Sequence, residues 1–532
     1  MSDAVAAAPA APAPPQTIPW LGLAAVLLGT FISTLNGRIS TFGLADVRGG
    51  VHAGFDEGAW ITTAQTVAQM FIAPIAVWIG GVYGPRRVLL DAAAVFTVIS
   101  FITPFSNGLP MLLALQFVGG LASGTFIPLT LGFLLRNLPP KYWAYGVAMY
   151  ALNLELSLNI SASLEGFYVE HLSWAWIFWQ NVPLAAGMVL CLHYGVPRDP
   201  KIANPPPSDW YGFAAGGLGL ALIYAALDQG NRLDWLNAGP IWALLLAGGV
   251  LVAGFVVHEL RIAHPGVDLR VVMAAPLPSL LVLIAFLRLT ILSTAFLIPQ
   301  YLQVVRGFRA LQVGQTLIWI AAPQLLFCPL AGLMLRRTDP RLVSSIGFIF
   351  ISLACLMVAH GLTPVWSSDQ FLPSQFLQAI GQSFALSGIV FFGVLHLKPQ
   401  DALTFGAALQ TARLMGGELG SSLIATLVRV RGQTASNLIG QHIQIGDGRV
   451  MQRLQGLAAV AGRADTGLGP ARAAGLLAGS VRSAAALQGI IDGFVVIGGA
   501  TALALLLLMV SRPAPLGPAS HRSLFSPAEP ST

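Results

Sequence analysis

Residues 239–258 read GPIWALLLAGGVLVAGFVVH, a stretch of twenty that contains no Asp, Glu, Lys or Arg. A helix of about 20 apolar residues is long enough to cross the hydrocarbon core of a bilayer. The stretch is therefore predicted to be a membrane-spanning helix. Segments of the same kind recur along the chain, so the fold is predicted to form inside a membrane.

The amino-acid composition supports this interpretation. Of the 532 residues, 55% are hydrophobic and only 9% are charged, whereas a soluble domain carries about 25% charged residues. A soluble enzyme, a disordered chain and a disulfide-stapled secreted domain are thereby excluded. The three cysteines, Cys191, Cys328 and Cys355, lie singly in apolar stretches, so neither a metal site nor a disulfide framework is predicted.

Fourteen apolar segments of spanning length can be located, and a weak internal repeat relates two groups of them. Gly80–Arg87 and Gly332–Arg341 both place a glycine, a short spacer and a basic turn after an apolar segment. Repeated six-helix halves with a site at their interface are typical of transporters. The predicted spans lie near residues 18–42, 59–82, 88–106, 110–133, 144–165, 174–194, 210–228, 239–258, 276–298, 312–335, 342–361, 372–395, 405–428 and 488–510.

The predicted fold class is thus an all-α polytopic membrane protein with two six-helix halves and two inserted helices. The long segment 430–487 precedes the last span, and its Ala, Leu and Gln content favours short helices. The predicted parts are a tail at 1–17, a bundle at 18–194, the inserted helices with their loops at 195–275, a bundle at 276–510 and a tail at 511–532.

The basic residues predict the orientation in the membrane. With the N-terminus inside, fourteen Lys and Arg residues fall in the cytoplasmic set and four in the short outside loops. Because basic residues accumulate on the cytoplasmic side, both termini are predicted to be cytoplasmic and segment 430–487 to be periplasmic. The same bias accounts for the net charge of +6 without a nucleic-acid partner.

Several motifs stand out along the chain. They are DEGAW at Asp56–Trp60, WAWIFWQNVP at Trp174–Pro183, LDQG at Leu227–Gly230 with LDW at Leu233–Trp235, and PQYLQ at Pro299–Gln303. These motifs resemble the major facilitator superfamily, and most closely its fourteen-helix drug:proton antiporter branch of the EmrB/QacA type. The resemblance covers about residues 20–510 and implies the major facilitator fold.

The chain also departs from the pattern of that branch. Asn36 stands where the family has an Asp, and Gln116 where it has an Arg. Ser161-Ala162 replaces the Gly-Pro of the antiporter motif, and Glu165-Gly166 its later glycine pair. The turn at Gly80, Gly84, Arg86 and Arg87 lacks the family's acidic residue, although the resemblance implies that it latches neighbouring helices in one state. The chain is therefore interpreted as a divergent member.

The span at 144–165 holds the candidate proton-coupling groups. Glu155, Asn159 and Ser163 recur at i, i+4 and i+8, which places them on one helix face. A polar face is expected to line a cavity or to contact another helix. Glu155 lies near mid-span and is the first candidate for proton coupling, with Glu165 the second. The alternative is a structural hydrogen bond or a fixed ion pair.

Arginines inside the spans are the candidate substrate contacts. A charged residue at the membrane centre costs about 2.5–3.5 kcal/mol on insertion scales, so it is expected to face a partner or a cavity. Arg38 could pair with Glu155 or Glu165, or contact an anionic substrate, and EmrB-type proteins also have an arginine at the position of Arg413. The cavity candidates are Asn36, Arg38, Gln116, Asn159 and Arg413.

The predicted function is secondary transport rather than catalysis. The chain contains no P-loop, HExxH or G-x-S-x-G motif, and no cofactor is predicted. Proton-coupled efflux of amphiphilic or aromatic compounds across a bacterial inner membrane, by alternating access, is expected. The alternatives are a dedicated exporter of one anionic metabolite without standard proton coupling, and a non-transporting membrane sensor. Besides membrane lipid and a small-molecule substrate, the resemblance is compatible with a periplasmic adaptor and an outer-membrane channel as partners.

Overall fold

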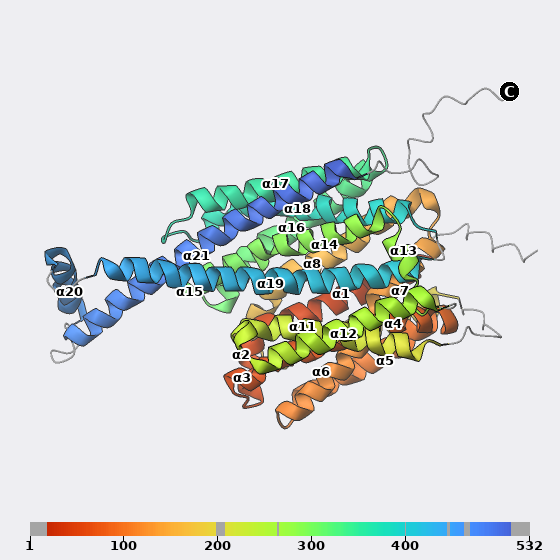
Figure 1. Ribbon diagram of the computed structural model, residues 1–532, viewed down its shortest axis with the longest axis horizontal. Helices are drawn as coiled ribbons and strands as arrows, with labels where there is room; N and C mark the ends of the chain where they lie inside the picture. Colours follow the sequence, from red (N-terminus) through yellow and green to blue (C-terminus); the bar gives the residue numbers. More distant parts are fainter. Residues whose placement is uncertain are drawn as a thin grey trace, which may run out of the picture.

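The computed structural model describes residues 19–197, 208–262, 265–398, 401–443, 447–461 and 469–511. Within these ranges the chain forms helices joined by short connections (Figure 1). The predicted tail at 1–17, and all of the predicted tail at 511–532 except Ser511, lie outside the described residues.

The N-terminal half consists of six long helical segments, one of which is divided at Thr125 into α6 and α7. Short helices occupy the connections. The elements are α1 (Trp20–Phe42), α2 (Leu44–Gly50), α3 (Phe55–Gly58), α4 (Trp60–Tyr83), α5 (Pro85–Ile102), η1 (Thr103–Phe105), α6 (Leu109–Gly124), α7 (Phe126–Asn137), η2 (Pro140–Tyr142), α8 (Trp143–His171), α9 (Trp176–Trp179) and α10 (Asn181–Gly195).

The inserted pair and the C-terminal half follow. The inserted pair is α11 (Trp210–Gly230) and α12 (Gly239–Arg261), with η3 (Trp235–Asn237) between them. The C-terminal half contains α13 (Leu269–Met273), α14 (Leu277–Leu292), the π-helical turn η4 (Ser293–Leu297), α15 (Ile298–Val304), α16 (Ala310–Leu335), α17 (Pro340–Gly361), α18 (Ser368–Leu395), α19 (Ala402–Gln441), α20 (Gly448–Ala461) and α21 (Gly469–Val510).

Eleven helices among the described residues are long and apolar enough to cross a membrane. The other three predicted spans correspond to α8, α10 and α19. Helix α8 carries Glu155 and Glu165, α10 has only 15 residues, and α19 carries Arg413 and Glu418. The charged residues of α8 and α19 lower the hydropathy of these two helices, and such residues usually face protein or a cavity rather than lipid. Helix α10 is instead shorter than the about 20 residues that cross a bilayer. The all-helical membrane fold is confirmed, and the total of fourteen spans stays a prediction.

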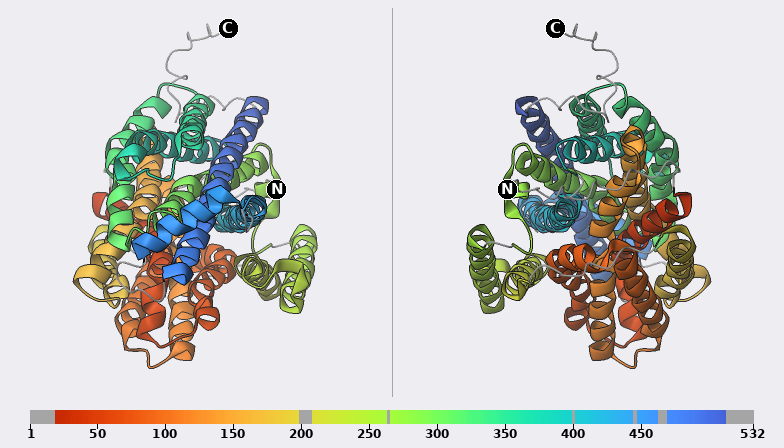
Figure 2. Two further views of the ribbon diagram at one scale, coloured as in Figure 1. Left: turned by 90° about the vertical axis from the view of Figure 1, so that its left-hand side faces the viewer. Right: turned by 90° about the vertical axis from the view of Figure 1, so that its right-hand side faces the viewer.

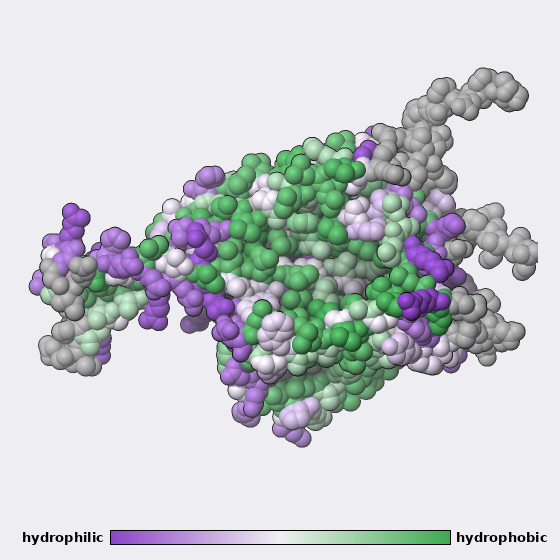
Figure 3. Space-filling view, viewed as in Figure 1, coloured by the Kyte–Doolittle hydropathy of each residue, from purple (hydrophilic) through white to green (hydrophobic). Residues whose placement is uncertain are grey.

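The surface of the bundle is apolar along its length and polar towards its ends. Figure 3 shows hydrophobic residues along the sides of the bundle, with hydrophilic residues gathered near its two ends. The inserted pair lies at the edge of the bundle (Figure 2), where α11 packs on α4 and contacts α19 while α12 packs on α11. Accordingly α12 is the most exposed of the candidate spans, with 17% of its apolar window buried.

One end of the bundle, here called the inner end, carries the turn at Gly84. Gly84 has a φ of 83°, a left-handed conformation that favours glycine. Beside this turn, Arg86 Nη2 donates to the carbonyl of His193, 3.2 Å away, near the end of α10. The start of α1 packs closely against the end of α10, so that a Cβ on Gly195 would lie 2.3 Å from Leu21 Cβ. Helices α10, α1 and the α4–α5 turn therefore meet at the inner end.

Helices α19 and α21 extend beyond the opposite end, here called the outer end, where α20 caps them (Figure 1). Segment 430–487 is thus largely a continuation of these two helices, with α20 as its separate short helix. Arg431 Nε donates to Asp492 Oδ2 across 2.5 Å and joins the two extensions near their base. The predicted short helices are found here as two long ones and one short one, because good helix formers let a helix continue past the membrane surface.

Candidate functional site

A cavity of about 200 Å³ lies where the two halves and α11 meet. Helices α1, α4 and α8 of the N-terminal half line it together with α11, α14, the π-helical turn and α19. The lining is rich in hydroxyl groups and charges, with one aromatic residue. The residues are Ser33, Thr34, Gly37, Arg38, Thr41, Thr62, Thr66, Gln69, Leu158, Tyr224, Asp228, Arg288, Ile291, Leu292, Ala295, Arg413, Leu414, Gly417, Glu418 and Ser421.

Three arginines from three helices enter this cavity. Arg413 of α19 donates from Nη2 to Gln410 Oε1 at 2.9 Å and from Nη1 to Thr34 Oγ1 at 3.1 Å. The charges of Arg288 interact with those of both Arg38 and Arg413. Among the described residues, none of the three forms an ion pair with a carboxylate. The three guanidinium groups therefore share the cavity without a carboxylate of the described chain in direct contact with any of them.

Arg38 is held by the π-helical turn. Its Nη2 donates to the carbonyl of Ala295 at 2.6 Å, and its guanidinium lies 4.9 Å from the centre of the Phe42 ring. Ala295 belongs to the π turn Ser293–Leu297, and such turns disturb the regular helical hydrogen bonds and are frequent at functional sites. The structure places Arg38 in contact with this carbonyl, and brings it into an ion pair with neither Glu155 nor Glu165 within the described chain.

Two of these guanidiniums retain unused hydrogen-bond donors. The buried Nε atoms of Arg38 and Arg288 have no hydrogen-bond partner within the part of the chain that the structure describes. Leaving a buried charged donor unsatisfied is expensive.

Two carboxyl groups line the same cavity from α11 and α19. Tyr224 donates from its hydroxyl to Glu418 Oε2 at 3.0 Å, and Asp228 follows Tyr224 by one helical turn. The sequence motif containing Asp228 marks the family, but nothing in the pattern showed that the inserted helix faces the cavity. The position of Glu418 inside the predicted span 405–428 is the signal in the sequence that could have identified it.

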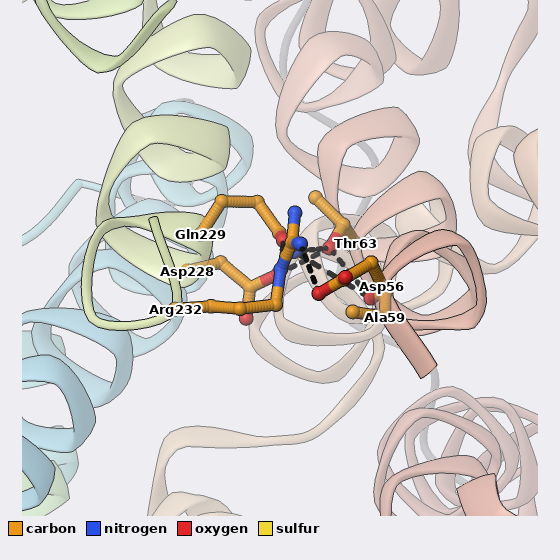
Figure 4. A network of polar contacts seen from close by, with 6 residues as sticks. All are labelled: Asp56, Ala59, Thr63, Asp228, Gln229 and Arg232. Atoms are coloured by element: carbon orange, nitrogen blue, oxygen red, sulfur yellow. Dashed lines mark hydrogen bonds and ion pairs between the residues drawn. The ribbon is translucent and has the colours of Figure 1, made fainter. Parts of the chain in front are cut away.

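Asp228 also belongs to a network that joins two of the sequence motifs (Figure 4). Thr63 donates to Asp228 Oδ2, and Gln229 Nε2 donates to the same oxygen at 2.8 Å. Arg232 Nε donates to Gln229 Oε1 at 2.8 Å, and its Nη1 donates to Asp56 Oδ1 at 2.9 Å. The network therefore connects the exposed Asp56 at the outer end with a carboxylate in the cavity.

Glu155 and Asn159 lie beside the cavity rather than in its lining. Asn159 Nδ2 donates to Gln382 Oε1 at 2.9 Å and to Gln324 Oε1 at 3.2 Å, which joins α8 to α18 and α16. Glu155 is only 1% exposed, and its Oε2 has no hydrogen-bond partner in the described ranges. Its charge interacts with those of Arg288 and Arg413. The predicted polar face of α8 thus contacts other helices.

The remaining predicted residues are buried outside the cavity lining. Asn36 Oδ1 accepts from Asn181 Nδ2 at 2.7 Å, which ties α1 to the start of α10. Gln116 is buried on α6, with its Nε2 unpartnered among the described residues. Glu165 is buried beside Gly43, whose Cβ would lie 3.3 Å from Glu165 Cγ. In the nearby α2, burial raises the pKa of Asp46 above its usual range.

The predicted latch lies at the inner end, where the two halves are in close contact. Across the halves, a Cβ on Gly406 of α19 would lie 2.7 Å from the carbonyl oxygen of Pro128 in α7. Within the first half, a Cβ on Gly80 of α4 would lie 2.3 Å from Leu129 Cδ2 in the same helix α7. Arg87 Nε lies 3.9 Å from Asp91 Oδ2 in an exposed pair. This arrangement packs α7 of the first half against α19 of the second.

The Major Facilitator Superfamily family model matches residues 26–421, and the chain belongs to this superfamily. It is 27% identical to the probable multidrug resistance protein EmrY of Escherichia coli, with 77% of this chain and 80% of EmrY covered. It is 23% identical to the multidrug export protein EmrB of Escherichia coli, with 76% and 79% covered.

The fold is that of solved transporters. The crystal structure of the human organic anion transporter MFSD10 matches with a TM-score of 0.57 at 15% identity, covering 93% of this chain and all of that one. At this identity the likeness shows the fold alone. The predicted family, the fold class and the divergence of this member are confirmed, and the chain is a membrane transporter related to multidrug exporters.

Proposed function

We propose that this transporter exports amphiphilic organic acids across the bacterial inner membrane by alternating access. The observation that carries the proposal is the meeting of Arg38, Arg288 and Arg413 in one cavity between the halves. Repeat-built transporters bind their substrates at such an interface. The anionic group of the substrate would accept from the arginines, and its apolar part would extend between the helices.

The size and lining of the cavity favour a polar head group over a large aromatic drug. Drug-sized ligands occupy pockets of about 300–1,000 Å³ lined mostly by apolar and aromatic groups, whereas this cavity measures about 200 Å³ and is lined by three arginines. The contacts at the inner end support a conformation closed on that side, from which substrate would leave towards the outer end.

A second candidate substrate class follows from the acids. Asp228 and Glu418 line the cavity together with the arginines, and a carboxylate pair suits an amphiphilic cation. The broader expectation of proton-coupled multidrug efflux includes both classes. The two classes differ in the charge of the head group that the cavity takes.

The orientation and partners complete the proposal. We place both termini in the cytoplasm and the extension formed by α19, α20 and α21 in the periplasm, where it is free to meet a periplasmic adaptor and, through it, an outer-membrane channel. The support is the distribution of basic residues and the projection of these helices beyond the outer end (Figure 1).

The test uses three probes with the same aromatic ring and different head groups. Purified protein in lipid nanodiscs is equilibrated with radiolabelled naphthalene-2-sulfonate, naphthylmethyl-trimethylammonium and naphthalenemethanol. We expect the sulfonate to bind most tightly, and Arg413→Gln to weaken it at least about tenfold, since a hydrogen bond to a charged group contributes about 1.5–3 kcal/mol. Arg306→Gln, at the exposed end of α15, is the matched control and should bind normally.

Preferential binding of the trimethylammonium probe, unaffected by Arg413→Gln, would contradict the proposal and support the cationic class. Direction is tested separately in proteoliposomes. Trapped sulfonate should leave vesicles that contain the wild type faster than vesicles that contain Arg413→Gln.

A further inference from the structure

We propose that the inner end of the inserted pair, α11 and α12, binds an anionic phospholipid through its phosphate head group. The site is a groove on the outer side of the pair, apart from the cavity between the two halves. It depends neither on the charge of the exported substrate nor on the direction of transport. A lipid held here would anchor α12, which packs on the rest of the protein mainly through α11 (Figure 2).

The first step is the shape of the groove. It measures about 640 Å³ and is lined by Tyr211, Ala253, Gly254, Val257, His258, Arg261 and Ile262. The lining residues of α12 extend over about 12 Å of helix. Small and apolar residues lie at the end towards the membrane interior, and His258 and Arg261 lie at the end towards the membrane surface. This order matches a phospholipid, whose acyl chain points inwards and whose head group lies at the surface.

The second step is the depth of the groove in the membrane. Trp210 and Tyr211, at the start of α11, are 61% and 62% exposed. The ring centre of Trp210 lies 5.7 Å from that of Trp78, which lies 6.4 Å from that of Tyr83 beside the turn at Gly84. Trp and Tyr gather at the membrane–water interface, where the head groups lie. The basic end of the groove is therefore at the level of the lipid phosphates.

The third step is the positive charge at this level. Arg261 is exposed, and its side chain makes no hydrogen bond or ion pair within the part of the chain that the structure describes. A second exposed arginine, Arg270, lies beside it, because its Nη2 donates to the carbonyl of Leu260 at 3.3 Å. The guanidinium group matches the geometry of a phosphate and can donate two parallel hydrogen bonds to it. Basic residues at a helix end attract anionic lipids.

A buried carboxylate orients the histidine of the groove. His258 Nε2 lies 2.9 Å from Asp209 Oδ1, and the side chain of Asp209 is only 5% exposed. The same oxygen accepts from the backbone N–H of Gly212, 3.0 Å away, which fixes the carboxylate at the start of α11. The ring centres of His258 and Tyr211 lie 4.9 Å apart. The histidine and the tyrosine therefore form a fixed wall of the groove beside Arg261.

The acids at this end do not oppose a bound anion directly. Asp209 is paired with the histidine behind the groove, and Glu259 is 2% exposed and faces α11, where a Cβ on Gly212 would lie 2.8 Å from its Oε1. Asp268 accepts from the backbone N–H of Arg270 at 3.0 Å. None of the three acids lines the groove. The charge that the groove presents to a ligand is therefore positive.

The experiment measures lipid binding to the full chain by native mass spectrometry from detergent. The probes are dioleoyl-phosphatidylglycerol, which is anionic, and dioleoyl-phosphatidylethanolamine, which has the same acyl chains and no net charge. We expect the wild type to bind the anionic lipid at least about fivefold more tightly, and Arg261→Gln to weaken that binding about fivefold, the effect of one basic residue at an anionic lipid surface. Arg337→Gln, an exposed arginine of the α16–α17 turn, is the matched control and should bind normally.

A second pair of variants tests the groove without changing charge. Gly254→Leu places a side chain in the groove, where the Cβ would lie 3.8 Å from the Tyr211 hydroxyl. Gly249→Leu makes the same change on an open part of α12 outside the groove, with no atom within 4 Å of the new Cβ. Both variants should elute as folded protein in size-exclusion chromatography. Gly254→Leu should weaken binding of the anionic lipid as much as Arg261→Gln does, and Gly249→Leu should not.

Three results would overturn the proposal. They are equal affinity of the wild type for the two lipids, wild-type affinity for the anionic lipid in both Arg261→Gln and Gly254→Leu, and an equal loss in Arg337→Gln. Displacement of the anionic lipid by sn-glycerol 3-phosphate, which lacks acyl chains, would also overturn it and assign the groove to a soluble phosphate. Arg261→Gln should bind naphthalene-2-sulfonate normally, so these outcomes are independent of the proposed substrate.

Discussion

The buried acid Glu155 and the partly buried acid Glu418 lie on different helices and meet very different surroundings. The helix of Glu155, α8, packs directly on α16, and two turns beyond Glu155 a Cβ on Gly314 would lie 2.6 Å from Ser163 Cα. Around Glu418, α19 leaves room for a cavity, and a Cβ on Gly417 would lie 3.6 Å from Arg288 Nε. The difference teaches that a polar residue inside a span predicts burial, whereas access to substrate depends on the width of the gap beside it.

The largest expected effect tests the close packing of α8 and α16. Gly314→Val should destabilise the protein by about 3 kcal/mol or more, because the new side chain meets backbone atoms that cannot yield without moving a helix. Thermal unfolding in detergent measures the loss. Gly417→Val beside the cavity is the matched substitution and should lose much less stability, because only side-chain atoms of Arg288 lie within 4 Å of its Cβ. Equal destabilisation by both changes would show that the two regions do not differ in packing.

A smaller effect is expected from the amide network on α8. Asn159→Leu should lower the free energy of unfolding by about 1–3 kcal/mol, since Gln324 and Gln382 lose a buried partner. Binding of naphthalene-2-sulfonate should be retained at the wild-type affinity, because this network lies outside the cavity lining. The same unfolding and binding assays measure both properties. A variant with wild-type stability and no sulfonate binding would reverse the roles assigned to the two regions.

The smallest effect is expected at the exposed end of the network in Figure 4. Asp56 has a side chain that is 77% exposed, and it pairs with Arg232. Exposed ion pairs contribute about 0–1 kcal/mol, so Asp56→Asn should change stability by no more than this, and the change should vanish at high salt. Asp91→Asn, in the exposed pair with Arg87, is the control of similar size. A loss well above about 1 kcal/mol would show that this pair holds α11 in place.

The spanning helices were predictable because their signal is local. Predicted spans such as 18–42 and 210–228 correspond closely to α1 at Trp20–Phe42 and α11 at Trp210–Gly230, since length and hydropathy decide whether a segment enters a membrane. The far ends of α19 and α21 were not predicted, because a helix can continue beyond the membrane surface once its residues favour it.

The candidate site was only partly predictable. Arg38 and Arg413 were identified as charges that need a partner or a cavity, and the structure places both in the cavity lining. Asn36, Gln116 and Asn159 were identified by the same argument and by family position, yet they lie outside that lining. A polar side chain in a span can be satisfied by another helix as well as by a substrate.

The sequence by itself determined that the chain is a helical membrane protein of the major facilitator type, because apolar length, loop charge and motifs are properties of continuous segments. Only the tertiary structure decided which charges share a space. Asp228 and Glu418 are separated by the whole C-terminal half up to α19, and Arg38 and Arg413 come from opposite halves. Their meeting depends on how the helices pack, and side-chain volumes across several interfaces determine that packing together.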